Sequence, residues 1–85
     1  MTREEIIEKT NSFLIEEIEI DGDLLTGDAS LRDDLGIDSL DFVDIVVLVE
    51  SRFGFKIKAE EMGDVKTLDQ FYDYIEGKVN APQRG

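Results

Sequence analysis

The sequence predicts an all-α protein: a small four-helix bundle of three main helices and one short helix, with a long loop between the first and second helices. Two observations predict this class. Apolar residues recur at helical spacing in three separate segments, and each of those segments follows residues that can cap a helix. With 85 residues, the chain has room for one domain. We expect the bundle to occupy residues 1–79, and residues 80–85 to form a disordered C-terminal tail.

The first helix is expected over residues 3–19, because Thr2 and Glu5 match the capping-box pattern. Its apolar residues recur at helical spacing: Ile6, Ile7, Phe13, Leu14 and Ile18. Residues 20–36 carry the signals of a loop, since "DGDLLTGDAS" is rich in Gly, Asp, Ser and Thr. Four leucines are expected to hold this loop on the core: Leu24, Leu25, Leu31 and Leu35.

The second helix is expected to begin with Asp38 or Ser39 as its cap and to run to about Phe53, with Gly54 ending it. The β-branched residues between 43 and 49 would also suit a strand. We prefer the helix because the polar residues at 41, 44, 51 and 52 do not alternate with period two. An acidic Asp41 in the first turn also interacts favourably with the helix dipole.

Two helices complete the predicted bundle. The segment "AEEM" at residues 59–62 can form one short turn of helix. Thr67 and Gln70 then repeat the capping-box pattern, and an apolar stripe that ends near Val79 follows them. The residues of that stripe are Leu68, Phe71 and Ile75, with Tyr72 or Tyr74.

The net charge is −12, from 21 acidic and 9 basic residues, which argues against nucleic acid and anionic membranes as partners. Proteins with basic patches are the expected partners. The acids concentrate between Glu19 and Glu50, where Arg32 is the only basic residue.

The chain has no cysteine, no signal-peptide pattern and no apolar run long enough to span a bilayer. We therefore expect the protein to be located in the cytoplasm. We also expect it to be a monomer.

A calcium site is one alternative for the acidic residues, because "DGDLLTGD" begins like an EF-hand loop. Counted from Asp21, the third ligand position holds Leu25, the glycine position holds Thr26 and the closing glutamate position holds Arg32. The pattern fails, so we predict no dedicated metal site. Loose binding of divalent cations by scattered acids stays open.

Ser39 lies in the stretch "DLGIDSLDFVD" at residues 34–44. A serine hydroxyl is a poor nucleophile until a base takes its proton, yet the chain has no histidine and no "SxxK" spacing after Ser39. We therefore expect no catalytic residue and no enzyme activity. Helix capping is the ordinary role of such a serine. A cap does not require Gly36 before it or Leu40 and Phe42 after it.

The stretch "DLGIDSLDFVD" resembles the signature of the acyl carrier protein family, and the similarity continues through "ASLRDDLG", "VESRFGFKI" and "VKTLDQFYDYI". The resemblance implies that a phosphopantetheinyl transferase attaches 4′-phosphopantetheine from coenzyme A to Ser39. It implies a stand-alone carrier of acyl thioesters that serves synthase enzymes in fatty acid, polyketide or specialised lipid biosynthesis. The missing histidine and cysteine then fit, because the transferase supplies the base and the arm supplies the thiol. An unmodified acidic adaptor with the same fold is the alternative.

The resemblance also implies two groups of residues around the second helix. The surface that meets basic patches on the transferase and on acyl-processing synthase enzymes would comprise Asp38, Leu40, Asp41, Asp44, Val47 and Glu50. The inner face of the helix and its neighbours would form a pocket for the acyl chain: Leu31, Val43, Val46, Val49, Phe53, Ile57, Val65, Phe71 and Ile75. Apolar spacing alone would identify the second group only as core.

Overall fold

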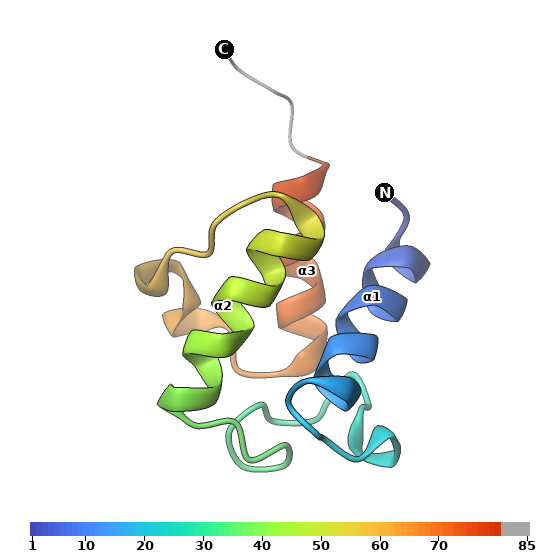
Figure 1. Cartoon of the computed structure of the whole chain (residues 1–85), viewed down its shortest axis with the longest axis vertical. Coiled ribbons are helices and arrows are strands. Elements are labelled where there is room, and N and C mark those ends of the chain that lie inside the picture. The colour runs from blue at the N-terminus through green and yellow to red at the C-terminus, as the bar shows by residue number, and fades with distance from the viewer. Residues whose placement is uncertain (81–85) are drawn as a thin grey trace.

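The computed structural model describes residues 1–80 and contains three α-helices and two short 3-10 helices (Figure 1). The elements follow the order α1 (Arg3–Glu16), η1 (Gly22–Leu24), α2 (Ser39–Phe53), η2 (Ala59–Asp64) and α3 (Leu68–Val79). The all-α class and the three-plus-one helix arrangement are confirmed. The short helix, η2, is of the 3-10 type. A second 3-10 turn, η1, lies in the long loop, where the sequence predicted no helix.

Capping boxes begin all three main helices. The pairs are Thr2 with Glu5, Asp38 with Asp41, and Thr67 with Gln70. At the other end of α2, Gly54 adopts the left-handed conformation with φ of 81°, which glycine tolerates without steric strain. The predicted limits of α2 and α3 are therefore confirmed. Asn80 caps α3 through its backbone N–H, which donates to the Glu76 carbonyl, and the rest of the predicted tail lies outside the described residues.

The predicted end of α1 was wrong: the helix stops at Glu16, three residues before Glu19. Glu19 has φ of 63°, a left-handed conformation that is uncommon for a residue other than glycine. This conformation turns the chain back, so that the backbone N–H of Ile20 donates to the Leu14 carbonyl at 2.9 Å. Ile20 is only 7% exposed, and its burial accounts for the early turn.

The core is assembled from all three α-helices and from the segments between them. Its buried residues include Ile6, Phe13 and Leu14 of α1, Ile45 and Val49 of α2, and Leu68, Phe71, Tyr72 and Ile75 of α3. Ile20, Ala29, Leu35 and Ile57 contribute from the connecting segments. No helix among the described residues is both long and apolar enough to cross a membrane.

The expectation that four leucines anchor the long loop holds for three of them. Leu35 is buried, and Leu25 and Leu31 are partly buried against the core. Leu24 is 46% exposed, so the prediction for this residue was wrong. Leu24 and Leu25 are neighbours in and after the tight η1 turn, where adjacent side chains point in different directions and only one of them reaches the core.

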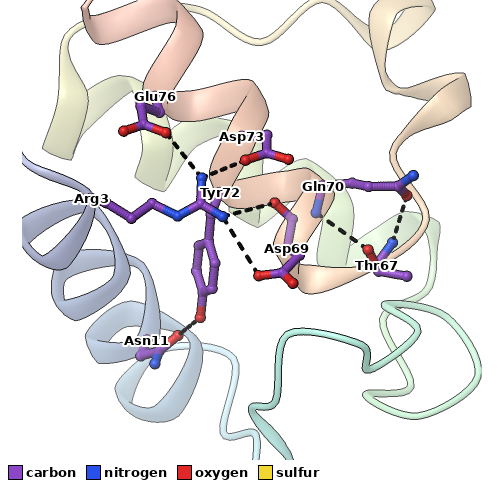
Figure 2. Close-up of polar contacts among 8 residues, drawn as sticks. All are labelled: Arg3, Asn11, Thr67, Asp69, Gln70, Tyr72, Asp73 and Glu76. Carbon is purple, nitrogen blue, oxygen red and sulfur yellow. Dashed lines mark hydrogen bonds and ion pairs between the residues drawn. The ribbon is translucent and has the colours of Figure 1, made fainter.

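Side chains from both α1 and α3 fix the packing of these two helices (Figure 2). The Arg3 guanidinium forms ion pairs with three carboxylates of α3: Asp69 at 3.5 Å, Asp73 at 2.5 Å and Glu76 at 3.1 Å. Arg3 also lies over the Tyr72 ring, and the Tyr72 hydroxyl donates to the side-chain oxygen of Asn11. These contacts hold the N-terminal half of α1 against α3.

The start of α3 holds the long loop in place through backbone hydrogen bonds. Around the isolated bridge between Ser30 and Thr67, Leu31 N–H donates to Lys66 O at 2.9 Å and Leu68 N–H donates to Ala29 O at 3.0 Å. Gly27 lies so close to α3 that a Cβ atom there would be 2.6 Å from an Asp69 carboxylate oxygen. The loop that leads into α2 therefore has a fixed path, and it fixes the start of that helix.

Candidate functional site

Ser39 is the first residue of α2, and its side chain is exposed. The cap of the helix is Asp38, whose carboxylate accepts the backbone N–H of Asp41 at 2.9 Å. The alternative that Ser39 itself is the cap is therefore wrong. No hydrogen bond within residues 1–80 engages the Ser39 hydroxyl. It is presented to solvent without an activating base.

A tight turn sets the position of Ser39 at the end of the long loop. Ser30 organises this turn: its carbonyl accepts the N–H of Leu35 at 3.0 Å, and its own N–H donates to the Asp34 carboxylate at 2.7 Å. Gly36 then takes a left-handed conformation with φ of 68°. Ile37 N–H donates back to Leu31 O at 2.9 Å, so the residues just before the Asp38 cap are held by the backbone.

An open groove of about 530 Å³ begins at Ser39. Its lining residues are Leu31, Arg32, Gly36, Ile37, Asp38, Ser39, Phe42 and Val65. Four of them are apolar and partly buried against the core, and Arg32 supplies the one positive charge. The groove thus joins an exposed hydroxyl to an apolar wall. A group bonded to this hydroxyl would lie between the apolar wall and open solvent.

Five of the six residues predicted for the partner surface are exposed. Leu40 and Val47 are 77% and 60% exposed, and the carboxylates of Asp38, Asp44 and Glu50 lie at the surface with them. Asp41 differs, because it is only partly exposed and its carboxylate lies 3.5 Å from the Asp38 N–H in the capping box. Its first role is therefore to stabilise the start of α2.

Val43 was predicted for the inner face of α2, and this prediction was wrong, because the side chain is 60% exposed. With Leu40 and Val47 it follows the spacing i, i+3, i+7, which places all three on one helix face. Sequence reasoning missed Val43 as a surface residue. The spacing from Leu40 was the signal that could have found it.

The other residues predicted for the acyl pocket do turn toward the bundle. Val49, Ile57, Phe71 and Ile75 are buried. Val46 and Phe53 are partly buried against the same core, and so are Leu31 and Val65, which also line the groove beside Ser39. The prediction omitted Ile45, which is 3% exposed and takes the inward place assigned to Val43. The helix is therefore rotated relative to the predicted inner face.

The residue types around Ser39 bear on whether the site could bind a metal ion or activate the hydroxyl. No group of three or more Asp, Glu, His or Cys side chains within the described part of the chain could hold a metal ion. Arg32 is the only basic residue lining the groove. The one carboxylate lining the groove, Asp38, accepts the Asp41 N–H, and no hydrogen bond within residues 1–80 joins it to the Ser39 hydroxyl.

Comparison with known proteins places this geometry in context. The family model described as "Phosphopantetheine attachment site" matches residues 12–75, which include Ser39 and the whole groove. A curated acyl carrier protein from Petrotoga mobilis is 38% identical over 80 residues, covering 94% of each chain. Another from Thermotoga maritima is 41% identical over 78 residues, covering 92% of this chain and 96% of the relative. A third, from Thermosynechococcus vestitus, is 35% identical over 81 residues, covering 95% and 100%.

Proposed function

The chain belongs to the acyl carrier protein family, and on that premise we propose that Ser39 is the residue to which 4′-phosphopantetheine is attached. The main support for this proposal is that Asp38 and Ser39 have different roles at the start of α2. Asp38 caps the helix, so the exposed Ser39 hydroxyl is left without a structural role. The adjoining groove offers the attached group an apolar wall on one side and open solvent on the other.

As a member of this family, the chain carries acyl intermediates as thioesters on 4′-phosphopantetheine. The attached group supplies the thiol, which the chain lacks because it has no cysteine. Ser39 contributes its Oγ atom as the acceptor of the phosphoryl linkage. We assign the base that takes the Ser39 proton to the modifying enzyme, because the one carboxylate lining the groove, Asp38, accepts the Asp41 N–H and no hydrogen bond within residues 1–80 joins it to the Ser39 hydroxyl. In this scheme the chain is a substrate of other enzymes and not a catalyst.

Carriers of this family work with phosphopantetheinyl transferases and with acyl-processing enzymes. For this chain we propose a transient partner surface on α2, formed by Asp38, Asp44 and Glu50 together with Leu40, Val43 and Val47. Its exposed apolar side chains are small anchors within an acidic rim. Basic patches on the partners would complement it, and a monomer would leave it free to meet one enzyme after another.

We propose that the inward residues of the bundle shelter the acyl chain. Val46 and Phe53 are partly buried against the core that holds the fully buried Val49 and Ile75, so an acyl chain entering between α2 and α3 would meet these apolar side chains. Leu31 and Val65 line the groove, and they would contact the attached group where it passes from Ser39 toward the bundle. Val43 is not part of this proposal, because it faces solvent.

Intact mass spectrometry tests the attachment site. After incubation with coenzyme A and a promiscuous phosphopantetheinyl transferase, the wild type should gain the mass of one phosphopantetheinyl group, and Ser39→Ala should gain none. Because Asp38 is the cap, Ser39→Ala should change the free energy of unfolding by less than about 0.5 kcal/mol, as expected for a surface position.

Ser51→Ala is the matched control, since Ser51 is also exposed on α2 but lies near its other end. This variant should be modified like the wild type. A mass gain that persists in Ser39→Ala would refute the site. A wild type that is never modified would favour the unmodified adaptor instead.

A further inference from the structure

Arg32 stands out among the basic residues of the chain. It is the only lysine or arginine between Glu19 and Glu50, and its exposed side chain lines the groove that begins at Ser39. The ion pairs found among residues 1–80 use Arg3 and Lys78 and do not include Arg32. Its guanidinium is therefore available to a ligand in the groove.

The backbone holds Arg32 at this rim. The preceding residue, Leu31, donates its N–H to Lys66 O and accepts the N–H of Ile37, both at 2.9 Å. The nearby Asp34 carboxylate is occupied by the Ser30 N–H at 2.7 Å. The long side chain of Arg32 thus extends from a fixed point. Arg32 also borders an adjoining groove that Asp33 and Lys66 line.

The helix dipole favours negative charge at the start of α2, but the carboxylates of Asp38 and Asp41 already lie there, so a further negative charge would be repelled by both unless a cation accompanies it. A phosphodiester on Ser39 would lie beside Asp38 and near Asp41, on a chain whose net charge is already −12. Like charges a few ångströms apart repel each other more strongly at a protein surface than in bulk water, because the effective dielectric constant is lower there. A guanidinium relieves such repulsion well, because its planar fork donates two parallel hydrogen bonds to phosphate oxygens.

We propose that Arg32 binds the phosphodiester of the attached group and directs the arm along the groove, against the apolar wall of Leu31, Phe42 and Val65. The inference rests on the proposed function, because it requires the group to be attached at Ser39. It assigns Arg32 a separate task, which is to neutralise the phosphate and to restrict the first part of the arm. The transfer of acyl groups does not itself depend on this contact.

Phosphorus-31 NMR of the loaded, unacylated protein tests the inference, since the phosphodiester supplies the only phosphorus in the sample. Loading is first verified by intact mass for wild type, Arg32→Gln and Arg52→Gln. Arg52 is the matched control, because it is an exposed arginine in the last turn of α2, the helix that begins at Ser39. Line width and the heteronuclear NOE then report how strongly the phosphate is restricted, with the urea-unfolded loaded protein as the unrestricted reference.

The wild type and Arg52→Gln should show a restricted phosphorus. In Arg32→Gln the restriction should fall to the unfolded reference, and Arg32→Lys, which keeps the charge but not the fork, should be intermediate. Added salt should also mobilise the wild-type phosphorus. Equal phosphorus mobility in wild type and Arg32→Gln, or an equal change in Arg52→Gln, would overturn the inference. Failure of the wild type to load would instead refute the proposed function.

Proton NOEs test separately whether the arm lies along the groove. Proton NOEs between the methyl groups of the arm and the side chains of Leu31 or Val65 should be present in the wild type and lost in Arg32→Gln. NOEs that persist unchanged in Arg32→Gln would refute the guiding role of Arg32. Circular dichroism should show the same helicity for all of the variants, because Arg32 makes none of the ion pairs found among the described residues.

Discussion

At the scale of single residues, Thr10 is unusual because its hydroxyl is buried without a hydrogen-bond partner among residues 1–80. It is 0% exposed on the core face of α1, and its hydroxyl is the one buried side-chain polar atom within residues 1–80 that has no hydrogen-bond partner. An unpaired buried hydroxyl costs about 1–3 kcal/mol, whereas valine fills nearly the same volume without a polar atom. Thr10 is therefore a place where a small substitution should improve the fold.

We expect Thr10→Val to raise the free energy of unfolding by about 1 kcal/mol. Urea denaturation followed by circular dichroism would measure this as a higher midpoint with an unchanged slope. Thr10→Ser is the control, because it keeps the hydroxyl and removes a buried methyl group, which should cost about 1 kcal/mol. A less stable Thr10→Val would mean that a buried water satisfies the hydroxyl.

Single-residue predictions succeeded where a local pattern defines the position. Thr2 and Thr67 were predicted from capping-box pairs, and Asp38 was one of the two caps considered for α2; all three cap their helices. The attachment of a group at Ser39, suggested by the "DSL" triplet, stays a prediction. The orientation of Val43 was not, because apolar residues fill positions 45–49 without a break and leave the helix no clear polar face. Several rotations of α2 then fit the apolar pattern, and only the spacing of Val43 from Leu40 and Val47, both predicted for the surface, favours the observed one. Packing against α1 and α3 selects one of them.

At the scale of elements, the Glu61 carboxylate of η2 makes polar contacts with two side chains of α3. Glu61 accepts a hydrogen bond from the Tyr74 hydroxyl at 2.8 Å and forms an ion pair with Lys78 at 2.9 Å. The hydrogen bonds from Lys78 and Tyr74 lower the pKa of Glu61 below its ordinary value of 4.5, and Glu61 in turn raises the pKa of Lys78. The attachment of η2 should therefore depend on pH.

A pKa that is lower in the folded protein gives stability above pH 4.5, and this stability is lost as the pH falls through the folded pKa. We therefore expect Glu61→Gln to have a lower urea midpoint than the wild type at pH 7, and the gap to close as the pH falls below about 4.5. Amide hydrogen exchange at pH 7 should locate the loosening to residues 59–65.

Glu60→Gln is the matched control, because Glu60 is exposed in the same 3-10 helix and its side chain takes part in none of the hydrogen bonds or ion pairs found within residues 1–80. It should behave like the wild type at every pH. An equal loss in Glu60→Gln would assign the effect to general charge reduction. A Glu61→Gln gap that stayed constant down to acidic pH would contradict the role of the ionised carboxylate.

The sequence predicted where helices begin better than it predicted where they end. Each helix start has a side chain that satisfies backbone N–H groups, so the signal is local. The end of α1 depends instead on Ile20, which reaches the core only if Glu19 adopts a left-handed conformation. That choice depends on tertiary packing, and the residues near Glu19 carry no local sign of it.

At the scale of the whole molecule, the acidic charge is compensated unevenly. Arg3 pairs with three carboxylates of α3 (Figure 2). Lys78 pairs with Glu61, so the cations of the ion pairs found within residues 1–80 belong to α1 and α3. Asp44 and Glu50 of α2 take part in none of the ion pairs found within residues 1–80. The α2 face next to Ser39 therefore keeps its negative field, which can steer a basic partner toward it.

This asymmetry predicts that Asp44→Lys/Glu50→Lys slows phosphopantetheine transfer to Ser39 mainly by weakening encounter. These positions suit the test because both are exposed and neither belongs to the capping box, whereas replacing Asp41 would also remove a cap. Transferase kcat/KM should fall by about tenfold at low salt, because charges at the rim of an interface act chiefly on the association rate. Wild type should lose activity as salt rises, and the variant should start low and change little.

Glu4→Lys/Glu8→Lys makes the same change in net charge on α1, which contributes no residue to the proposed surface, and therefore separates local from global charge. We expect this control to retain most of the wild-type kcat/KM and its salt dependence, with circular dichroism verifying the fold of both variants. If the two double variants lose activity equally, the partner senses only total charge. If neither loses activity, recognition rests on Leu40, Val43 and Val47, whose exposed side chains would then have to supply the whole contact.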